Sequence, residues 1–288
     1  MKILVIGKHG YISTSFQDYM KKYPQHEVKA ISVRDESWKS VDFSKYDAVF
    51  NTAALAHNNA RKGTDEEFMA LNAVLPVEIA KKAKADGVKQ FIHMSSMIVY
   101  GNMRPIGDHT KYSDDTVPTP NNIYGRSKLQ GEQGLQTLES DNFKVALIRS
   151  PLVYGENATD NFEKLVKFAK TFPIFPDIKN ERSMIYADNL CELVRLIVEN
   201  ESRGLFCPQQ ECYICTSQIV KDIAVAMHHG LHLTRFFNPI LRVMSKRVGI
   251  VDKVFGTEAY EMNMSNAFDG KYRVVSYEES IQRIATKK

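Results

Sequence analysis

Long hydrophobic runs are missing from this chain of 288 residues, and so are internal repeats and low-complexity linkers. No segment is apolar over the length that a bilayer-spanning helix needs. The apolar start, residues 1–7, is shorter than the core of a signal peptide and ends at Lys8-His9. We therefore expect a cytoplasmic globular protein, long enough for one large domain or two unequal ones.

The chain also has only four cysteines and no strong excess of one charge. The net charge of +4 is spread along the chain, so it does not favour a nucleic-acid partner. Cys212 and Cys215 have the spacing of half a zinc site, but no second pair of ligands follows at a suitable spacing. Tyr213 and Ile214 between them suit a buried strand, so we predict core cysteines and no metal site.

Short apolar runs alternate with amphipathic stretches through the first half of the chain. The runs predict buried strands over residues 2–6, 28–33, 48–51, 90–94 and 144–148. The stretches predict helices over residues 15–22, 68–86 and 124–140, the second of them ending before Gly87. This alternation predicts an α/β fold, a Rossmann-type doubly wound parallel sheet with helices on both faces.

The pattern loosens after about Pro151, where prolines and irregular stretches become frequent. We expect residues 1–150 to form the sheet domain and residues 151–288 to form mainly a smaller, partly helical lobe, with some segments returning to the first domain. The lobe is expected to lie over the carboxyl edge of the sheet, where ligands of such folds bind.

A glycine loop, Gly7-Lys8-His9-Gly10, joins the first predicted strand to the helix that follows. Gly7 permits the tight turn, and Gly10 lets a pyrophosphate approach the backbone at the helix N-terminus. The third position of the motif is usually glycine and is Ser13 here, whose side chain is small enough to pack. The loop predicts that residues 1–150 bind a dinucleotide; the alternative is a purely structural turn.

The residues after the second predicted strand bear on the choice between NAD and NADP. An acidic residue there binds the ribose hydroxyls of NAD, whereas an arginine accommodates the additional phosphate of NADP. This chain has both, Arg34 and then Asp35. We favour NADP, because Arg34 comes first and Lys8 and His9 are expected nearby. Otherwise Arg34 is a solvated loop charge.

Tyr124 and Lys128 are expected to share one face of a helix, because residues four apart are neighbours there. A tyrosine is a poor acid–base catalyst near neutral pH, since its pKa is about 10. A neighbouring ammonium favours the phenolate and lowers that pKa, so the pair can move a proton to and from a sugar or alcohol oxygen. We therefore expect a lowered pKa for Tyr124.

Five motifs follow one another in the order typical of extended short-chain dehydrogenases/reductases. They are the glycine loop, Val41-Asp42-Phe43, Asn51-Thr52-Ala53-Ala54, Ser95-Ser96-Met97-Ile98-Val99-Tyr100-Gly101 and Tyr124-Gly125-Arg126-Ser127-Lys128. Nearly the whole chain resembles the epimerase/dehydratase branch of that family, whose members are NAD(P)-dependent nucleotide-sugar epimerases, dehydratases and ketoreductases.

The resemblance assigns catalytic roles to three residues. Ser96 would hydrogen-bond the substrate oxygen that Tyr124 protonates or deprotonates. Lys128 would bind the nicotinamide ribose and depress the Tyr124 pKa. The alternative for Ser95 and Ser96 is a pair of strand-end hydroxyls that satisfy backbone groups.

The resemblance also implies a set of cofactor contacts. Asp42 would hold the adenine amino group, the two alanines at 53 and 54 would pack on the dinucleotide, and Asn72 would support the site structurally. The full set implied is Gly7, Lys8, His9, Gly10, Tyr11, Ile12, Arg34, Asp42, Phe43, Ala53, Ala54, Lys128 and Pro151.

Two segments of the second half resemble substrate-binding parts of the family. Residues 149–155 resemble the run that borders the nicotinamide, but Leu152 stands where an asparagine bonds the sugar nucleotide in galactose epimerases. Residues 181–190 resemble the segment whose arginine grips the diphosphate of a UDP-sugar, which assigns that role to Arg182. The alternative for Arg182 is a surface salt bridge.

The stretch from 233 to 255 mixes apolar and basic residues. It is expected to be a basic amphipathic helix that packs on its own domain; the alternative is peripheral contact with a membrane or a partner enzyme. The resemblance also implies a homodimer.

We hypothesise redox chemistry at carbon 4 of a UDP-sugar in the synthesis of capsule or O-antigen precursors, as the resemblance implies. The leading hypothesis is reduction of a UDP-2-acetamido-2,6-dideoxy-4-hexulose, because an exchangeable NADPH suits a reductase and Arg34 suits NADPH. The alternative is a UDP-glucose or UDP-GlcNAc 4-epimerase that holds NAD tightly. A remote alternative is a non-catalytic NADP-binding sensor, against which the intact triad of Ser96, Tyr124 and Lys128 argues.

Overall fold

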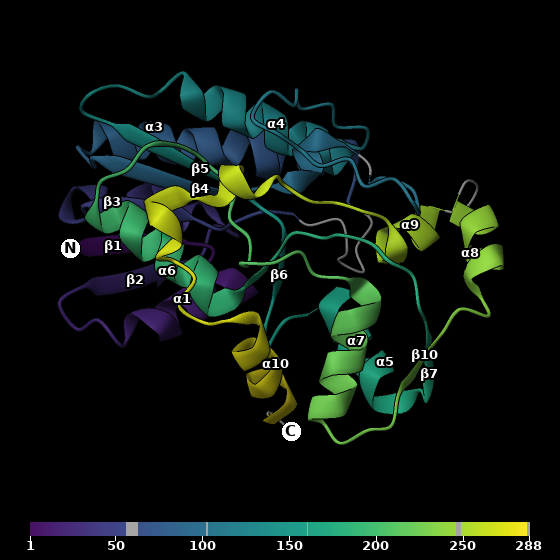
Figure 1. Ribbon diagram of the computed structural model, residues 1–288. Helices are drawn as coiled ribbons and strands as arrows, with labels where there is room; N and C mark the ends of the chain where they lie inside the picture. Colours follow the sequence, from purple (N-terminus) through teal and green to yellow (C-terminus); the bar gives the residue numbers. More distant parts are fainter. Residues whose placement is uncertain (56–62, 102, 160, 246–248, 287–288) are drawn as a thin grey trace.

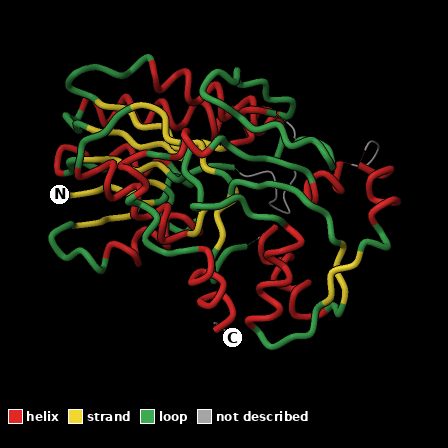
Figure 2. The backbone as a smooth tube through the Cα atoms, viewed as in Figure 1, coloured by secondary structure: helices red, strands yellow, loops and turns green. Residues whose placement is uncertain are grey.

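A parallel sheet of six strands, covered by helices on both faces, forms the larger part of the molecule (Figures 1 and 2). The computed structural model describes residues 1–55, 63–101, 103–159, 161–245 and 249–286. The strands, in their order across the sheet, are β2 (Glu27–Ile31), β1 (Lys2–Ile6), β3 (Ala48–Asn51), β4 (Gln90–Ser96), β5 (Lys144–Ser150) and β9 (Gly204–Phe206). The predicted Rossmann-type doubly wound sheet is confirmed.

The strand order creates the crevice in which a ligand can bind. β2 and β3 lie on opposite sides of β1, so the chain turns in opposite directions after the first and second strands. Loops that leave the carboxyl ends of β1 and β3 diverge at such a switch point. The glycine loop and the segment after Asn51 therefore border the same crevice.

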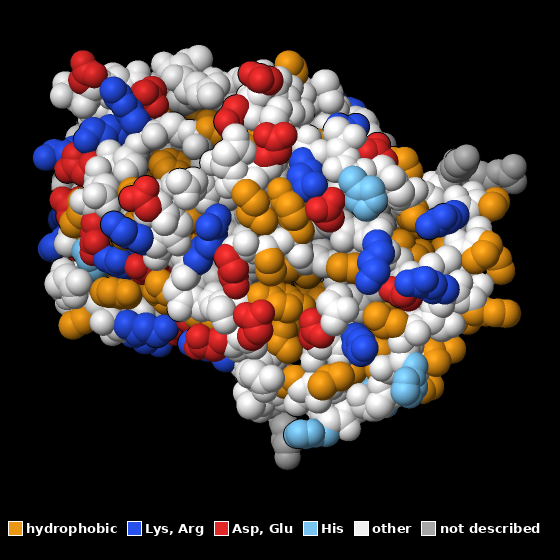
Figure 3. Space-filling view, viewed as in Figure 1, with side chains coloured by type: hydrophobic (Ala, Val, Ile, Leu, Met, Phe, Trp, Pro, Cys, Tyr) orange, Lys and Arg blue, Asp and Glu red, His pale blue; other side chains and the backbone are white. Residues whose placement is uncertain are grey.

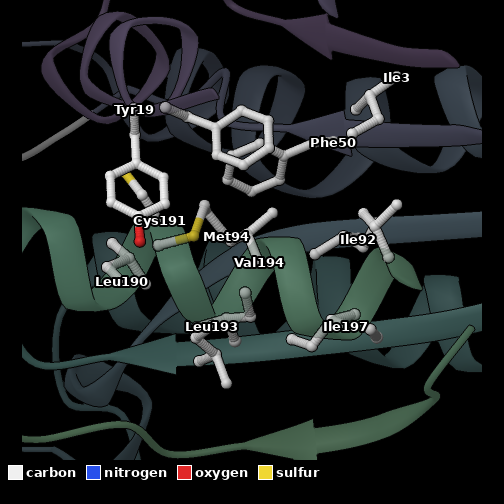
Figure 4. Packing of buried hydrophobic residues seen from close by; sticks show 14 of the residues in the cluster. Ile3, Tyr19, Phe50, Ile92, Met94, Leu190, Cys191, Leu193, Val194 and Ile197 are labelled. Carbon is white, nitrogen blue, oxygen red and sulfur yellow. The ribbon is translucent and has the colours of Figure 1, made fainter. Parts of the chain in front are cut away.

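Alternating side chains of each strand fill two separate cores. On one face, Ile3 and Phe50 pack with α1 (Tyr11–Met20) and α6 (Ala187–Glu199), from which Leu193 and Val194 point toward the strands (Figure 4). On the other face, Leu4 and its neighbours pack with α3 (Leu75–Ala85) and α4 (Ile123–Gln136). Burial on both faces explains why the strands are continuous apolar runs rather than alternating ones.

The smaller lobe lies at the lower right in Figure 1 and has its own apolar core. Its helices are α5 (Asn161–Thr171), α7 (Thr216–Ala226), α8 (Asn238–Ser245), α9 (Gly249–Phe255) and α10 (Tyr277–Thr286). Its short parallel strand pairs are β6 (Leu152–Tyr154) with β8 (Met184–Tyr186) and β7 (Ile174–Pro176) with β10 (His232–Thr234). Two elements from the second half, β9 and α6, instead complete the sheet and its cover.

Element boundaries differ from the predicted ones where local backbone geometry decides them. The first helix begins at Tyr11 rather than residue 15, because Gly10 already serves as its N-cap. The predicted helix over 68–86 is α2 (Asp65–Met69), a π-helical turn (Ala70–Val74) and α3, which follow one another directly. Gly87, with φ of +86°, ends it as expected.

The predicted single amphipathic helix over residues 233–255 is wrong. The stretch comprises the end of β10, then α8, then α9, and residues 246–248 lie outside the described part. Pro239 near the start of α8 suits the beginning of a helix, so a new helix starts there rather than one continuing from before. Among the described residues, no helix is both long and apolar enough to cross a membrane.

Candidate active site

The glycine loop lies against the carboxyl end of β3 and leaves a helix N-terminus open. Gly7 has φ of +107°, and a Cβ there would lie 2.8 Å from Thr52 Oγ1, so only glycine fits. Gly10 caps α1 without a side-chain hydrogen bond, and the first turn carries no acidic residue. The first backbone N–H groups of α1 are therefore available to an anionic diphosphate, which fits a dinucleotide.

Two residues of opposite charge follow β2, an exposed arginine and an aspartate whose side chain accepts a local hydrogen bond. Arg34 is exposed, as are Lys8 and His9 of the glycine loop. Asp35 Oδ1 accepts a hydrogen bond of 3.0 Å from Ser37 N and thereby caps the next short 3₁₀ helix. The carboxylate that would bind ribose hydroxyls is thus engaged locally, whereas the guanidinium of Arg34 faces solvent.

Some predicted cofactor residues are core or capping residues in this structure. Phe43 is fully buried among the apolar side chains under the sheet, so its ring is not free to touch a ligand. Asp42 is exposed and accepts hydrogen bonds from both the N–H and the hydroxyl of Ser44. Tyr11 packs against the turn at Gly155, where a Cβ would lie 2.7 Å from the tyrosine Oη.

Other predicted residues line the crevice or lie next to it. Ala54 is exposed beyond the end of β3, and Ala53 is partly buried beside it. Ile12 is partly buried in the first turns of α1, and Pro151 is buried between β5 and β6.

Asn72 ties the loop after β3 to the helix that carries Tyr124 and Lys128. Its Oδ1 accepts a hydrogen bond of 2.8 Å from Leu55 N, and its Nδ2 donates to Leu55 O at 3.0 Å and to Ser127 Oγ at 3.1 Å. The side chain is fully buried in the π-helical turn. The structure therefore gives Asn72 the supporting place that the resemblance implied.

Helix α4 begins immediately before Tyr124 and approaches the end of β4 very closely. Asn122 caps the helix by accepting a hydrogen bond of 2.8 Å from Gly125 N. A Cβ on Gly125 would lie 2.9 Å from Ile98 O, so the absence of a side chain permits this approach. Ile98 lies in the short 3₁₀ helix (Met97–Tyr100) that Ser96 caps. The glycine between Tyr124 and Lys128 thus brings the tyrosine next to Ser96.

Ser96 and Tyr124 lie next to each other at the carboxyl edge of the sheet, close enough for the serine hydroxyl to affect the phenol. Burial raises the pKa of Tyr124, and the hydroxyl of Ser96 acts in the opposite direction. Both side chains are partly exposed. Tyr124 is therefore a protonated phenol near neutral pH, held beside a hydroxyl that can share a substrate oxygen with it.

The expected lowering of the Tyr124 pKa by Lys128 is wrong in this structure. Lys128 is 2% exposed, and its Nζ donates a hydrogen bond of 2.8 Å to Met94 O in β4. Burial lowers the pKa of Lys128 to about 8, against the favourable effect of Glu132. The ammonium is thus held at the sheet rather than on the phenol.

Glu132 and Arg149 form a buried ion pair behind Ser96, Tyr124 and Lys128, which the sequence motifs did not predict. Glu132 accepts hydrogen bonds from Arg149 Nε at 3.1 Å and Nη2 at 2.7 Å, and also from the hydroxyl of Ser95. Arg149 Nη1 donates a hydrogen bond of 2.7 Å to Tyr100 Oη. The pair joins α4 to the ends of β4 and β5. The available signal was that Glu132 follows Lys128 by four residues on one helix face.

Arg182 is an internal residue rather than an exposed arginine. It is 6% exposed; Nη1 donates to Lys253 O at 2.7 Å and Nη2 lies 3.4 Å from Glu258 Oε2. The alternative of a surface salt bridge is therefore wrong, because the ion pair is buried. The predicted contact with a diphosphate remains a prediction, in which the anion would compete with Glu258 for the guanidinium.

Cys212 and Cys215 are only partly buried, so their prediction as core cysteines is wrong. They lie where the chain enters α7 near the surface of the lobe, and Cys215 Sγ donates to Ile178 O at 3.4 Å.

Comparison with known proteins identifies the chain. The model of the NAD-dependent epimerase/dehydratase family matches residues 3–206. The chain belongs to this family. Within the short-chain dehydrogenases/reductases it is an extended member, as the order of its motifs predicted.

Relatives of this epimerase/dehydratase-family chain include both epimerases and reductases. It is 29% identical over 252 residues to a UDP-glucose 4-epimerase of Vibrio cholerae, which covers 78% of this chain and 75% of the relative. A dTDP-4-dehydrorhamnose reductase of Mycolicibacterium smegmatis is 29% identical over 55% of this chain and 48% of the relative. The family assignment supports NAD(P)-dependent chemistry on a nucleotide sugar.

Solved structures confirm the fold over the whole length. The UDP-glucuronic acid 4-epimerase of Bacillus cereus, in complex with UDP-glucuronic acid and NAD, has a TM-score of 0.73 at 18% identity. The alignment covers 100% of this chain and 98% of that one. At this identity the likeness shows the fold alone.

The pKa of Lys128 predicts the alkaline limit of activity in the reductive direction. Above its pKa of about 8 the free enzyme loses the positive charge of Lys128, four residues from Tyr124 on α4, whereas Tyr124 keeps its proton because burial raises the pKa of its phenol. We expect kcat/KM to fall about tenfold per pH unit above that value. If the deprotonation of Lys128 causes this fall in kcat/KM, the fall moves to higher pH in the Lys128→Arg variant. If this variant is active and its kcat/KM still falls above about pH 8, the fall is caused by the ionisation of another group.

Proposed function

We propose that this chain reduces the 4-keto group of a UDP-linked 2-acetamido-2,6-dideoxy sugar with NADPH, in the synthesis of surface polysaccharide. The observation that carries the proposal is the pair of Ser96 and a protonated Tyr124 at the crevice of a dinucleotide-binding sheet. The raised pKa keeps this phenol protonated at neutral pH, so that it has a proton to give to an oxygen that is becoming a far more basic alkoxide.

The chain's own residues manage the proton and the position of the sugar, while the bound dinucleotide supplies the hydride. Ser96 donates a hydrogen bond to the substrate oxygen and holds it beside Tyr124. Tyr124 transfers its proton to that oxygen as the carbonyl carbon gains a hydride. Lys128, which lies four residues further along the same helix and is held on Met94 O, adds positive charge on the side of the site where the phenolate is left. Glu132 maintains that ammonium, since its charge raises the pKa of Lys128.

The surroundings of β2 support NADPH as the reductant. Arg34 is exposed immediately after the strand, and Lys8 and His9 add further exposed nitrogen groups in the neighbouring loop. An arginine fork binds a phosphate more strongly than a neutral hydroxyl. Asp35, the residue that would favour NAD, already accepts the N–H of Ser37. NADPH is a diffusible co-substrate, as a reductase needs.

A second candidate is a UDP-sugar 4-epimerase that holds NAD between turnovers. Its support is the relative of greatest coverage among those described above, named a UDP-glucose 4-epimerase. In that reaction Tyr124 would first remove a hydroxyl proton as a phenolate, a form that its raised pKa makes scarce near neutral pH. Leu152, where galactose epimerases carry an asparagine, removes one sugar-nucleotide hydrogen bond that the resemblance associates with them.

The two reactions differ in their demand for cofactor. The purified protein is incubated with UDP-GlcNAc or UDP-glucose without added dinucleotide, and in parallel with a UDP-4-keto-6-deoxy sugar and NADPH. We expect one NADPH to be oxidised for each keto sugar consumed, and no reaction in the first mixture. Steady formation of the carbon-4 epimer without added cofactor would overturn the reductase proposal and establish the epimerase.

A further inference from the structure

Helix α8 presents an apolar face to solvent. Ile240, Val243 and Met244 lie on one side of the helix at spacings of three and four residues, and the first two are 60% and 61% exposed. Phe236, just before the helix, is 79% exposed. These four residues make up the α8 face. Helix α8 lies at the right-hand edge of the molecule (Figure 1), where hydrophobic side chains reach the surface (Figure 3). Large side chains this exposed and this close together mark an interaction site.

The opposite side of α8 is held firmly by the lobe, so the exposed face is fixed in place. Leu241 packs on the lobe core, and Ser245 is buried, accepting a hydrogen bond of 3.2 Å from Ile106 N and pairing with Asp252. Just before the helix, Arg235 Nε donates a hydrogen bond of 3.0 Å to Asp177 Oδ2. At the first residue of the helix, Asn238 Nδ2 donates one of 2.8 Å to the backbone carbonyl of Asp177. The helix is therefore packed on one side only.

A second group of exposed apolar residues belongs to the same lobe. Phe168 of α5 and Phe172, the residue that follows this helix, stack with ring centroids 4.7 Å apart and are 42% and 45% exposed. Ile174 follows in β7 and lies opposite His232 of β10, the strand that leads to Phe236. The β7–β10 ribbon thus links the two apolar groups.

Basic residues outnumber acidic ones around these groups. From His228 to Ser245 the chain contains two arginines and no acidic residue. Helix α5 adds three exposed lysines, Lys164, Lys167 and Lys170, against one exposed acidic residue, Glu163. Lys164 shares a helix face with Phe168. Exposed aliphatic and aromatic side chains flanked by basic ones are the pattern of helices that lie in the interface of anionic membranes.

We propose that the α8 face, with the exposed end of α5, docks this protein onto the surface of an anionic phospholipid bilayer. Phe236, Ile240 and Val243 enter the boundary between headgroups and acyl chains, while Arg242 and the α5 lysines contact lipid phosphates. A second copy of the chain fits less well, because a symmetric contact through this face would bring the basic groups of both copies together. The contact is peripheral and reversible, as the small apolar area requires.

Vesicle flotation with the full chain tests the proposal. Vesicles of phosphatidylglycerol and phosphatidylcholine are compared with pure phosphatidylcholine vesicles at low and high salt. We expect binding to the anionic vesicles only, and its loss at high salt, because headgroup charges are screened there. The double variant Phe236→Ser/Ile240→Ser is expected to bind at least about tenfold more weakly. The triple variant Lys164→Gln/Lys167→Gln/Arg242→Gln is expected to lose about 100-fold.

Matched controls separate the patch from general hydrophobicity and charge. Leu205→Ser removes an apolar side chain that is 47% exposed on the edge strand β9, and Lys29→Gln removes an exposed charge from β2 at the other edge. Both are expected to float like the wild type. Equal thermal melting of all variants shows that they are folded.

Three results would overturn the proposal. They are the absence of wild-type binding to the anionic vesicles, equal binding by the patch variants, and a wild-type dimer in analytical ultracentrifugation that Phe236→Ser/Ile240→Ser converts to monomer. The last result would show that a second copy covers the face.

Discussion

Replacement of Tyr124 by phenylalanine is expected to lower kcat for reduction of the 4-keto sugar by about 10²- to 10⁴-fold, the usual contribution of a positioned proton donor. The ring can stay in place, because it packs 6.2 Å from Phe68, centroid to centroid, and only the hydroxyl next to Ser96 is lost. Steady-state kinetics with NADPH and the 4-keto sugar measure the effect. Fluorescence titration with NADPH is expected to give an unchanged Kd.

Tyr23→Phe is the matched control for this experiment. Tyr23 Oη donates a hydrogen bond of 3.3 Å to Glu192, on the face of the sheet covered by α1 and α6. Its loss is expected to leave kcat within about twofold, as for a surface substitution away from the site. Turnover by Tyr124→Phe at the wild-type rate would refute the acid role of Tyr124.

Replacement of Glu132 by glutamine is expected to destabilise the fold by about 3–5 kcal/mol, since it leaves the charge of Arg149 buried without a partner. The two side chains are only 1% and 10% exposed. Urea unfolding measures the loss as a lower midpoint at an unchanged slope. Glu132→Gln/Arg149→Met is expected to lose less than the sum of the two single variants, because neither charge is then left alone.

An exposed ion pair provides the control for the buried one. Lys21 and Asp18 are 2.7 Å apart on the surface, with side chains 76% and 70% exposed. Asp18→Asn is expected to change the free energy of unfolding by at most about 1 kcal/mol. An equal effect of Asp18→Asn and Glu132→Gln would contradict the special role given to the buried pair.

The ion pair also links stability to catalysis. The carboxylate of Glu132 raises the pKa of Lys128, opposing burial. Folded Glu132→Gln protein should therefore lose reductive activity at a lower pH than the wild type.

Much of the sheet could be predicted because its signals are local. Strands that are buried on both faces have continuous apolar sequences, which can be recognised without knowing their neighbours. The turn at Gly7 is equally local, because it follows from the conformation of one residue. The proximity of Ser96 and Tyr124 was also predicted, but through the family resemblance rather than through spacing. Its physical cause, the contact of Gly125 with Ile98 O, depends on two segments that are distant in sequence.

The failed predictions concern residues whose partners come from elsewhere in the chain. Arg182 and Glu258 are 76 positions apart, so the sequence around either residue does not predict that they form a buried ion pair. The Tyr124 pKa was predicted from its helix neighbour alone, whereas burial by the surrounding fold dominates and Met94 O binds the ammonium. The mixture of apolar and basic residues from 233 to 255 is plain in the sequence. It does not show which side of α8 packs on the lobe and which side stays exposed.

The most direct test of the central claim follows one hydride. NADPH carrying deuterium at the transferable position of its nicotinamide is mixed with the UDP-4-keto-6-deoxy sugar, and the product is examined by mass spectrometry and proton NMR. If Ser96, Tyr124 and Lys128 form a reductase site, each product molecule carries one deuterium, located at carbon 4, and one NADP⁺ appears per product. Product without deuterium, or epimerised sugar formed with no NADP⁺, would contradict the account.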